Sequence, residues 1–512
     1  MDSSNLELNA VIQILICALT AGWIIKYIYT SRRQRQYDEA ISNAHKCQPV
    51  RSTLSNKWPL GLDLLKKQYD AFNERRLFAF QAQHLAPLDA TVAIWLFGQQ
   101  GWFTTDSKNI EYINATRFED YGLGSRRDGC LPFLGEGIFC QDGPAWKHSR
   151  EVLRRQFARI QYNDLSAFED HVDTFVSTFA DAKGIVDVQP ACFRFTLSTT
   201  TALLFGEPID DLGDTMTKEF GDAFDDASEK TALRLRLADL CFLYNPSSYK
   251  ASCDVVRKYA DHFISKAIKC RGESGEKEAF ARYPFIIDMY NEVGDVQRVR
   301  DQLINVLLAG RDTTACMMSW AIFMLVRHPE KLAKLRDEIY AVSEGKTTFT
   351  RNHLVKMPYL KAVINETLRL YPQIPVNVRI ALKTTWLPRG GGADGEQPIL
   401  IRKGQGVGFS TYHMHRRKEI YGEDANDFRP ERWMTGELSE VGSGFMPFHS
   451  GPRICLGKDF AFTEASYAIA RFVQAYPELR LPDGVEALPV GLEPQSLTIV
   501  VSSADGCKVL LN

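Results

Sequence analysis

The sequence lacks the features of several common classes of protein. It has no CxxC pair, and its eleven cysteines are odd in number and scattered, so neither a zinc knuckle nor a disulfide framework is expected. The 61 lysines and arginines are matched by 63 acidic residues, which leaves a net charge of -2 and no basic footprint for nucleic acid. No repeat recurs at periods of about 20 to 50 residues. Most cysteines are therefore expected to be small buried residues in a reducing compartment.

Long apolar runs are also scarce, and the one that stands out is AVIQILICALTAGWIIKYIY, residues 10–29. Its length of about 20 residues is what a helix needs to cross a bilayer. A cleaved signal peptide would carry its basic residues in front of the run, whereas Arg32, Arg33 and Arg35 follow it. We therefore expect an uncleaved anchor with the bulk of the chain on the side of these arginines. A buried core helix is the alternative interpretation.

The expected anchor divides the chain into four parts. We expect a lumenal N-terminus at residues 1–9, a transmembrane anchor at 10–29, a basic linker at 30–50 and one large folded domain at 51–512. A domain of that length buries a sizeable core.

Apolar periodicity predicts a mainly α protein. From about residue 103 to residue 350, apolar residues recur three and four positions apart. The segment Val296–His328 contains no proline, stops before Pro329 and is apolar nearly all round in its second half, so we expect a buried central helix. Residues 381–412 instead alternate glycine-rich turns with short β-prone runs, which predicts a small β-sheet region.

The central helix contains the polar segment AGRDTT. It places Gly310, Asp312 and Thr313 within one turn. An acid beside a hydroxyl in an apolar helix can relay protons, although a tolerated polar patch or a salt bridge is the alternative interpretation. Glycine costs about 1 kcal/mol relative to alanine inside a helix, and a threonine hydroxyl can bond back to a carbonyl and bend it. The helix is therefore expected to open here.

Two further segments offer paired charges. Glu366 and Arg369 of ETLR are three residues apart on one helical face, a spacing that is common on helix surfaces and contributes little there. Downstream, Arg432 lies between Pro430 and Trp433 in FRPERW. A buried network of Glu366, Arg369 and Arg432 would tie the helix to the loop that follows.

WKHSR places Trp146 and Arg150 one turn apart on a helical face. An amphipathic helix often produces this pattern. Both side chains can only donate hydrogen bonds, so the pair would also suit an anionic ligand edge.

FHSGPRICLG, Phe448–Gly457, sets Cys455 just before an amphipathic helical stripe. The dipole and the free N–H groups of a helix N-terminus favour a thiolate. An anionic sulfur with backbone donors around it is a ligand for heme iron. Gly451 and Gly457 permit a tight loop and a close approach of the backbone to a porphyrin.

Taken in order, AGRDTT, ETLR, PERW and FHSGPRICLG resemble four motifs of the cytochrome P-450 family of heme-thiolate monooxygenases. The resemblance covers roughly residues 50 to 505 and implies the cytochrome P-450 fold, heme b as cofactor and O2 as co-substrate. It implies Cys455 as the axial ligand of the iron, Asp312 and Thr313 as the acid–alcohol pair that delivers protons, and Gly310 as the kink that makes room for oxygen. The structural network would be Glu366, Arg369 and Arg432.

The resemblance also implies a set of heme-contacting residues. They are Trp146, His148, Arg150, Arg379, Phe448, Gly451, Arg453 and Gly457.

Partners and location follow from the same resemblance. Anchor and heme domain leave no length for a flavin or nicotinamide domain, so electrons would come from NADPH-cytochrome P-450 reductase, or from a cytochrome b-type donor. The domain would lie on the cytosolic side of the endoplasmic reticulum membrane. The basic residues near the cysteine loop in sequence that would suit an acidic flavoprotein are Arg416, Arg417, Lys418 and Lys458.

Three longer segments sharpen the resemblance: GEGIFCQDGPAWKHSREVLRRQFAR, PRGGGADGEQPI and YGEDANDFRPERW are similar to the fungal branch that hydroxylates n-alkanes and fatty acids at or near the chain end. His449-Ser450 and Cys316-Met317-Met318 depart from that branch, so the substrate stays open. The side chains expected to form an apolar pocket for an alkyl chain are Phe133, Leu134, Val306, Leu307, Ile374 and Val376.

We therefore expect a membrane-anchored monooxygenase that hydroxylates a fatty acid or an n-alkane at a terminal or near-terminal carbon. One alternative is the same chemistry on a polyketide- or lipid-like secondary metabolite. A heme-thiolate isomerase or dehydratase is a further alternative, against which Asp312 and Thr313 argue because such an enzyme needs no proton delivery to oxygen.

Overall fold

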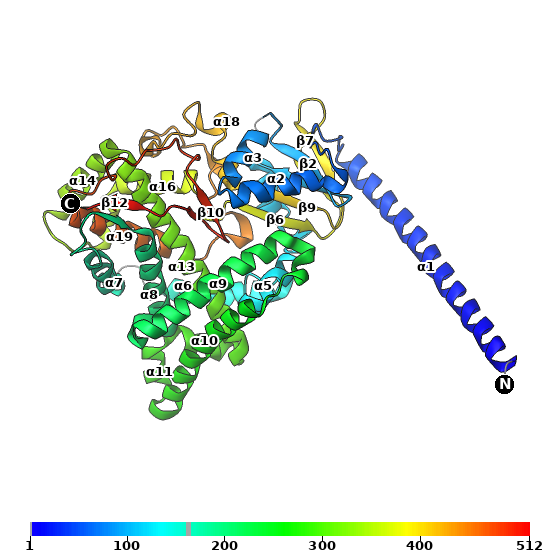
Figure 1. Ribbon diagram of the computed structural model, residues 1–512, viewed down its shortest axis with the longest axis horizontal. Helices are drawn as coiled ribbons and strands as arrows, with labels where there is room; N and C mark the ends of the chain where they lie inside the picture. The colour runs from blue at the N-terminus through cyan, green and yellow to red at the C-terminus, as the bar shows by residue number, and fades with distance from the viewer. Residues whose placement is uncertain (1–2, 86, 160–164, 512) are drawn as a thin grey trace.

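The computed structural model describes residues 3–85, 87–159 and 165–511 and confirms a mainly helical fold with small sheets (Figure 1). The helices are α1 (Ser3–Ala44), α2 (Leu62–Asn73), α3 (Leu77–Leu85), α4 (Ser107–Glu111), α5 (Arg126–Leu134), α6 (Gly143–Arg159), α7 (Ser166–Ser177), α8 (Gln189–Phe205), α9 (Asp214–Leu237), α10 (Ser247–Ser274), α11 (Glu276–Arg282), α12 (Pro284–Val293), α13 (Val296–Arg327), α14 (Pro329–Ser343), α15 (Arg351–Val355), α16 (Pro358–Leu370), α17 (Thr411–Met414), α18 (Lys418–Tyr421) and α19 (Lys458–Ala475).

The central helix is α13, which ends one residue before the predicted limit. Asp295 caps its N-terminus by accepting a hydrogen bond from the N–H of Arg298, and Pro329 begins the next helix. It packs against α8, α10, α16 and α19 and crosses the middle of the molecule (Figure 1). Its first half belongs to one large hydrophobic cluster and its second half to another, with the polar segment 309–314 between them.

The main sheet has six strands, in the order β1 (Ser52–Leu54), β2 (Thr91–Leu96), β3 (Gln99–Thr104), β9 (Gly406–Ser410), β6 (Val376–Ala381) and β4 (Tyr121–Gly122). Three two-stranded sheets complete the fold: β7 (Thr385–Gly391) with β8 (Gln397–Ile401), β10 (Gln495–Leu497) with β11 (Val501–Ser503), and β5 (Ile185–Asp187) with β12 (Lys508–Leu510).

The sequence placed the small sheet region only at residues 381–412. The structure adds an antiparallel β2–β3 hairpin, in which Thr91 pairs with Thr104 and Leu96 with Gln99. β3 then pairs with β9 in parallel, so that Trp102 lies opposite Val407. Residues some 300 positions apart in the chain thus form one sheet, a pairing that local periodicity cannot indicate.

The N-terminal helix α1 extends away from the body of the protein (Figure 1). It continues to Ala44 and so includes most of the predicted linker, because its last turns dock on the sheet region: Thr384 donates a hydrogen bond of 2.6 Å to Asp38, and the rings of His45 and Trp386 stack at 3.3 Å. Within the described part of the chain, no helix combines the length and the apolar content that a membrane crossing requires.

The transmembrane span expected at residues 10–29 is therefore not confirmed. Every side chain of the run is described from Leu15 onward. This part contains the charged Lys26 and ends three residues before Arg32. The side chains of residues 10–12 and 14 lie outside the described part.

A buried ionic network ties α16 to the loop before the cysteine. The Arg369 guanidinium donates two hydrogen bonds of 2.8 Å to the Glu366 carboxylate, and Arg432 donates a third of 3.0 Å. All three side chains are fully buried. Trp433 donates to the same carboxylate at 2.9 Å, so both carboxylate oxygens are satisfied. The three residues that the sequence grouped into a network thus lie in contact.

Glu366→Gln is expected to destabilise the protein by about 3–5 kcal/mol, because it leaves two buried guanidinium groups without their carboxylate. Thermal unfolding and the retained heme, both measured on the holoprotein, test this. Glu419→Gln is the matched control, since Glu419 pairs with Arg417 at the surface and its loss costs about 1 kcal/mol or less. Equal unfolding temperatures for the two variants would contradict the expectation.

Candidate active site

The cysteine loop passes close to the backbone of η2 (Tyr112–Thr116). The N–H of Cys455 donates to the carbonyl of Phe448 at 3.1 Å, which closes the loop around η8 (Gly451–Arg453). Gly451 has a φ of +68°, and a Cβ there would lie 1.9 Å from the carbonyl oxygen of Asn114. Only glycine therefore fits at this position. Among the described residues, a Cβ at Gly457 would contact the Phe157 ring alone, at 3.7 Å. The protein therefore does not itself require glycine at this position.

The Cys455 thiol is accessible to solvent even though protein atoms surround it densely. Burial raises the pKa of this thiol above its ordinary value, against the opposing effects of the Gly457 N–H, Arg150 and Lys458. The helix N-terminus predicted from the sequence is present, because α19 begins at Lys458. Its field does not outweigh desolvation, so the thiolate needs a further cation. A metal ion that coordinates sulfur supplies that charge.

Four arginines converge beside the cysteine loop: Arg126, Arg150, Arg379 and Arg453. Burial, and then repulsion from Arg126 and Arg453, lower the pKa of Arg379 to about 9. Burial also lowers the pKa of Arg453 to about 10, although this guanidinium pairs with Asp142 at 2.6 Å. This one carboxylate does not balance the four cations. An anionic ligand with more than one carboxylate, as heme is, fits the cluster.

The predicted heme-contacting residues do not all lie together. Trp146 is buried, with the Arg453 guanidinium 4.4 Å from its ring centre and the Arg150 guanidinium 5.8 Å from it. His148, two residues after Trp146, is exposed on α6. Its role as an additional donor stays a prediction.

His449, which departs from the expected branch, lies next to the arginine cluster. Its Nε2 is 3.2 Å from the Asn377 amide nitrogen, and burial followed by repulsion from Arg379 and Arg126 lowers its pKa to about 3. The imidazole is therefore neutral at physiological pH and adds no charge to the cluster.

The acid of the central helix is held by neighbours on two helices. Asp312 accepts a hydrogen bond of 3.0 Å from Arg311, and the Arg311 guanidinium is in turn 2.5 Å from Asp225 of α9. The Ser228 hydroxyl, also on α9, lies 3.5 Å from the second carboxylate oxygen of Asp312. Burial raises the pKa of Asp312 to about 6, and Arg311 only partly offsets this. A carboxyl with such a pKa can both release and take up a proton near neutral pH.

Thr313 and Gly310 lie one turn apart on α13. The Thr313 hydroxyl donates to the Ala309 carbonyl at 2.6 Å. A Cβ on Gly310 would lie 2.8 Å from the Thr200 hydroxyl oxygen, so this glycine lets α8 approach closely. α13 is one continuous helix through this region, and the kink expected at Gly310 stays a prediction.

The predicted pocket residues differ in accessibility. Phe133, Leu134 and Leu307 are fully buried and pack in the hydrophobic core, where the Phe133 ring meets Phe224 of α9 at 5.3 Å. Val306 is 7% exposed. Ile374 and Val376 are partly accessible; Val376 begins β6 and Ile374 lies two residues before it.

The basic residues expected to meet a reductase are less free than the sequence indicated. The Arg416 guanidinium lies 3.6 Å over the Tyr412 ring. Arg417 pairs with Glu419 at 3.2 Å, and Lys418 pairs with Glu423 at 2.5 Å. Lys458 is exposed next to the cysteine loop.

Sequence reasoning missed two residues of the site. Arg126 joins the arginine cluster from α5, an element whose place beside the cysteine loop only the fold reveals. Glu464 is fully buried on α19 and accepts a hydrogen bond from Thr199 of α8. Burial raises its pKa to about 8, and the hydroxyls of Thr199 and Thr314 partly offset this. An acid between apolar positions 461 and 465 of the helical stripe is the sequence signal that could have identified it.

Comparison with known proteins identifies the family. The family model described as cytochrome P450 matches residues 93–498. This chain belongs to the cytochrome P450 family. Membership gives the protein a thiolate-ligated heme iron and monooxygenase activity.

Three similar relatives come from fungi. A cytochrome P450 of Arthroderma benhamiae is 39% identical over 97% of this chain and 98% of its own length. Cytochrome P450 52A10 of Candida maltosa is 39% identical over 91% of this chain and 92% of its own length. The cytochrome P450 monooxygenase himC of Aspergillus japonicus is 35% identical over 100% of this chain and 92% of its own length. The expected fungal branch is confirmed.

Glu464 predicts a measurable dependence of stability on pH. An acid whose pKa rises on folding, here from 4.5 to about 8, keeps its proton in the folded state after the unfolded chain has lost it. Its contribution to stability is therefore complete below about pH 4.5 and is lost as the pH rises through about 8. Glu464→Gln does not titrate, so it should gain on the order of 3 kcal/mol relative to the parent between pH 5 and pH 8.5. Thermal unfolding of both holoproteins across this range checks the sign; a constant difference would refute it.

Proposed function

We propose that this cytochrome P450 inserts one oxygen atom from O2 into a terminal or near-terminal C–H bond of a long alkyl chain, on a fatty acid or an n-alkane. The observation that carries the proposal is an accessible Cys455 thiol beside a cationic cluster that suits heme, in a chain 39% identical to a 52A enzyme. Cys455 is the proposed iron ligand.

The bound heme supplies the oxygen activation, and the chain supplies its position. The guanidinium groups of Arg126, Arg150, Arg379 and Arg453, with the Trp146 indole, would hold the heme carboxylates. The hydrogen bond from the Cys455 N–H to the Phe448 carbonyl closes the loop and so fixes the position of the Cys455 sulfur relative to the loop backbone.

Protons reach the site through α13. Arg311 stays charged and relays no proton itself; it pairs with both Asp225, whose side chain is 61% exposed, and the buried Asp312, and so holds Asp312 near the surface. Asp312, with a pKa of about 6, passes protons on to the Thr313 hydroxyl at the next position.

The proposed location is the surface of the endoplasmic reticulum membrane, with α1 as the attachment. Apolar side chains of α1 are exposed to solvent, among them Leu19 (73%), Trp23 (68%) and Ile25 (67%). η5 (Ala238–Leu243) adds Phe242 and Leu243, both 68% exposed. Exposed apolar surface of this kind suits a lipid interface, from which an alkyl substrate also comes. Electrons come from a separate NADPH-cytochrome P450 reductase that docks near the exposed Lys458.

A second candidate substrate is a lipid-like secondary metabolite. Cys316, Met317 and Met318 support it, because they depart from the alkane-hydroxylating branch and lie buried directly after the proton-delivering segment. The reaction and the roles of Asp312, Thr313 and Cys455 are the same in both cases.

Thr313→Ala should leave the strongly red-shifted absorbance of the ferrous carbon-monoxide complex intact and raise hydrogen peroxide formed per NADPH several-fold. The reason is that the proton relay loses its last hydroxyl, so reduced oxygen leaves without entering the substrate. Thr313→Ser keeps the hydroxyl and is the matched control. Product yield per NADPH equal to that of the parent in Thr313→Ala would rule out this role.

Affinity for alkyl compounds should rise with chain length from about C8 to about C18, by up to about fourfold for each CH₂ group, because each buried methylene contributes about 0.8 kcal/mol. Titration of the purified protein with fatty acids, alkanes and lipid-tailed metabolites, followed by the low-to-high-spin shift of the heme, measures this directly. Tight binding of a polar aromatic compound, with no shift for any alkyl compound, would overturn the proposed substrate class.

A further inference from the structure

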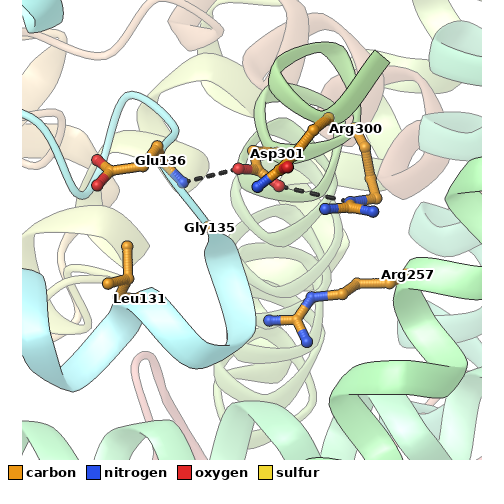
Figure 2. A pocket seen from close by; sticks show the side chains of 7 residues that line it. Leu131, Gly135, Glu136, Arg257, Arg300 and Asp301 are labelled. Atoms are coloured by element: carbon orange, nitrogen blue, oxygen red, sulfur yellow. Dashed lines mark hydrogen bonds and ion pairs between the residues drawn. The ribbon is translucent and has the colours of Figure 1, made fainter. Parts of the chain in front are cut away.

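Residues 134–139, which run from the last residue of α5 toward α6, include the predicted pocket residue Leu134 together with Ile138 and Phe139 and are called the apolar wall below. Hydrogen bonds fasten this segment to the central helix. The Glu136 N–H donates to the Asp301 carboxylate at 2.9 Å, the interaction that Figure 2 shows. The N–H groups of Ile138 and Phe139 donate to Gln302 at 3.1 Å and to Asn305 at 2.9 Å. Consecutive turns of one face of α13 thus accept the N–H groups of the segment.

Two carbonyl groups of the segment, those of Leu134 and Glu136, accept hydrogen bonds from side chains that belong to or are linked with the same set. The Asn305 amide donates to the Leu134 carbonyl at 2.8 Å. The Gln302 amide donates to Ser149 at 2.7 Å, Ser149 donates to Gln141 at 2.6 Å, and the Gln141 amide donates to the Glu136 carbonyl at 2.8 Å. The segment therefore has no need of a strand or helix partner.

Two glycines let the segment lie this close to α13. A Cβ on Gly135 would lie 2.2 Å from Cγ of Asp301, and a Cβ on Gly137 would lie 2.0 Å from the Asn305 amide nitrogen. Gly135 also has a φ of +64°. Any side chain at either position would push the segment off the helix.

The outer side of the segment borders a cavity of about 330 Å³. It is lined by Gly135 and Glu136 on one side and by Arg257, Arg300 and Asp301 on the other (Figure 2). The carboxylate of Asp301 reaches both the segment and Arg300, whose Nε is 3.5 Å away. Residue 136 is thus held by Asp301 of α13, by the Gln141 amide and by an ion pair with Arg127 of α5, while the cavity leaves its outer side without packing.

We propose that Asp301, Gln302 and Asn305 are positioning residues that set the substrate specificity of this enzyme, because they fix the apolar wall at 134–139 relative to Asp312 and Thr313 on the same helix. Asn305 lies two turns before Asp312, so the wall and the proton-delivering pair move only together. This inference rests on the function proposed above. Its consequence is that the depth at which an alkyl chain stops, and hence the carbon that is hydroxylated, depends on these hydrogen bonds.

Asn305→Leu tests the proposal, since leucine has a similar size and offers neither donor nor acceptor. We expect amide hydrogen exchange in residues 134–140 to become at least about tenfold faster. We also expect hydroxylation to spread from the terminal carbon to inner carbons, with the carbon-monoxide spectrum unchanged. Asn291→Leu is the matched control, because Asn291 donates to Glu276 at the surface of α12.

Gly137→Ala approaches the same contact from the other side. It should reproduce the exchange and product changes of Asn305→Leu, and the double variant should be no worse than either single change, because both disrupt one contact. Gly272→Ala is its control, since a Cβ there meets nothing within 4 Å. Should Asn305→Leu fail to bind heme, Gln302→Met replaces it, as it removes the acceptor for the Ile138 N–H at similar length.

Unchanged exchange in residues 134–140, or an unchanged distribution of products, would overturn this proposal. Exchange is measured without substrate, so it decides the structural part even if the parent enzyme hydroxylates no alkyl chain. A parent enzyme that hydroxylates no alkyl chain would overturn the proposed substrate class instead.

Discussion

The burial of α13 on nearly all sides is the constraint on which the rest of the site depends. A buried polar group without a partner costs about 1–3 kcal/mol, so each polar side chain on this helix dictates what can lie beside it. In its first half Asn305 holds the segment before α6, and in its middle Asp312 is held by Arg311 and Ser228. In its second half the Trp320 indole donates to the Val501 carbonyl at 3.0 Å, which brings in the C-terminal sheet. One helix thereby sets the positions of the elements around the heme.

The Glu366 network and the arginine cluster differ in how their charges are balanced. Around Glu366, every charge finds a partner inside the protein, so this network is complete without a ligand and fixes the approach to the cysteine loop. Among the described residues, the arginine cluster has one paired carboxylate, that of Asp142, and burial together with repulsion between arginines lowers the pKa of Arg379 and of Arg453. Binding of the heme carboxylates relieves that repulsion in the folded state only, so heme should contribute to stability as well as to chemistry.

The sequence predicted those features that local patterns encode. The central helix, the Glu366–Arg369 pair and the cysteine loop depend on spacing within short segments, whereas the contact of Glu366 with Arg432, 66 residues later, was predicted from the order of the motifs. The β2–β3–β9 arrangement depends on pairing between distant segments, and the place of Arg126 beside Arg453 depends on how α5 packs. The close contact of Gly310 with Thr200 likewise depends on the crossing of α13 and α8, which no single helix encodes.

Helix α9 joins the substrate wall to the proton supply. Its Phe224 packs against Phe133, the residue directly before the wall at 134–139, while Asp225 and Ser228, one and four residues later, contact Arg311 and Asp312. The Phe224 ring also lies 5.1 Å from the Arg311 guanidinium, so it shields the ion pair of Arg311 with Asp312 from water. A substrate that displaced Phe133 would press on the same turn of α9 that keeps Asp312 buried. Burial is what raises the pKa of Asp312 to about 6. The same face of α9 therefore contacts the residues beside the wall and keeps the proton donor buried, so the shape of the wall and the pKa of Asp312 depend on one another.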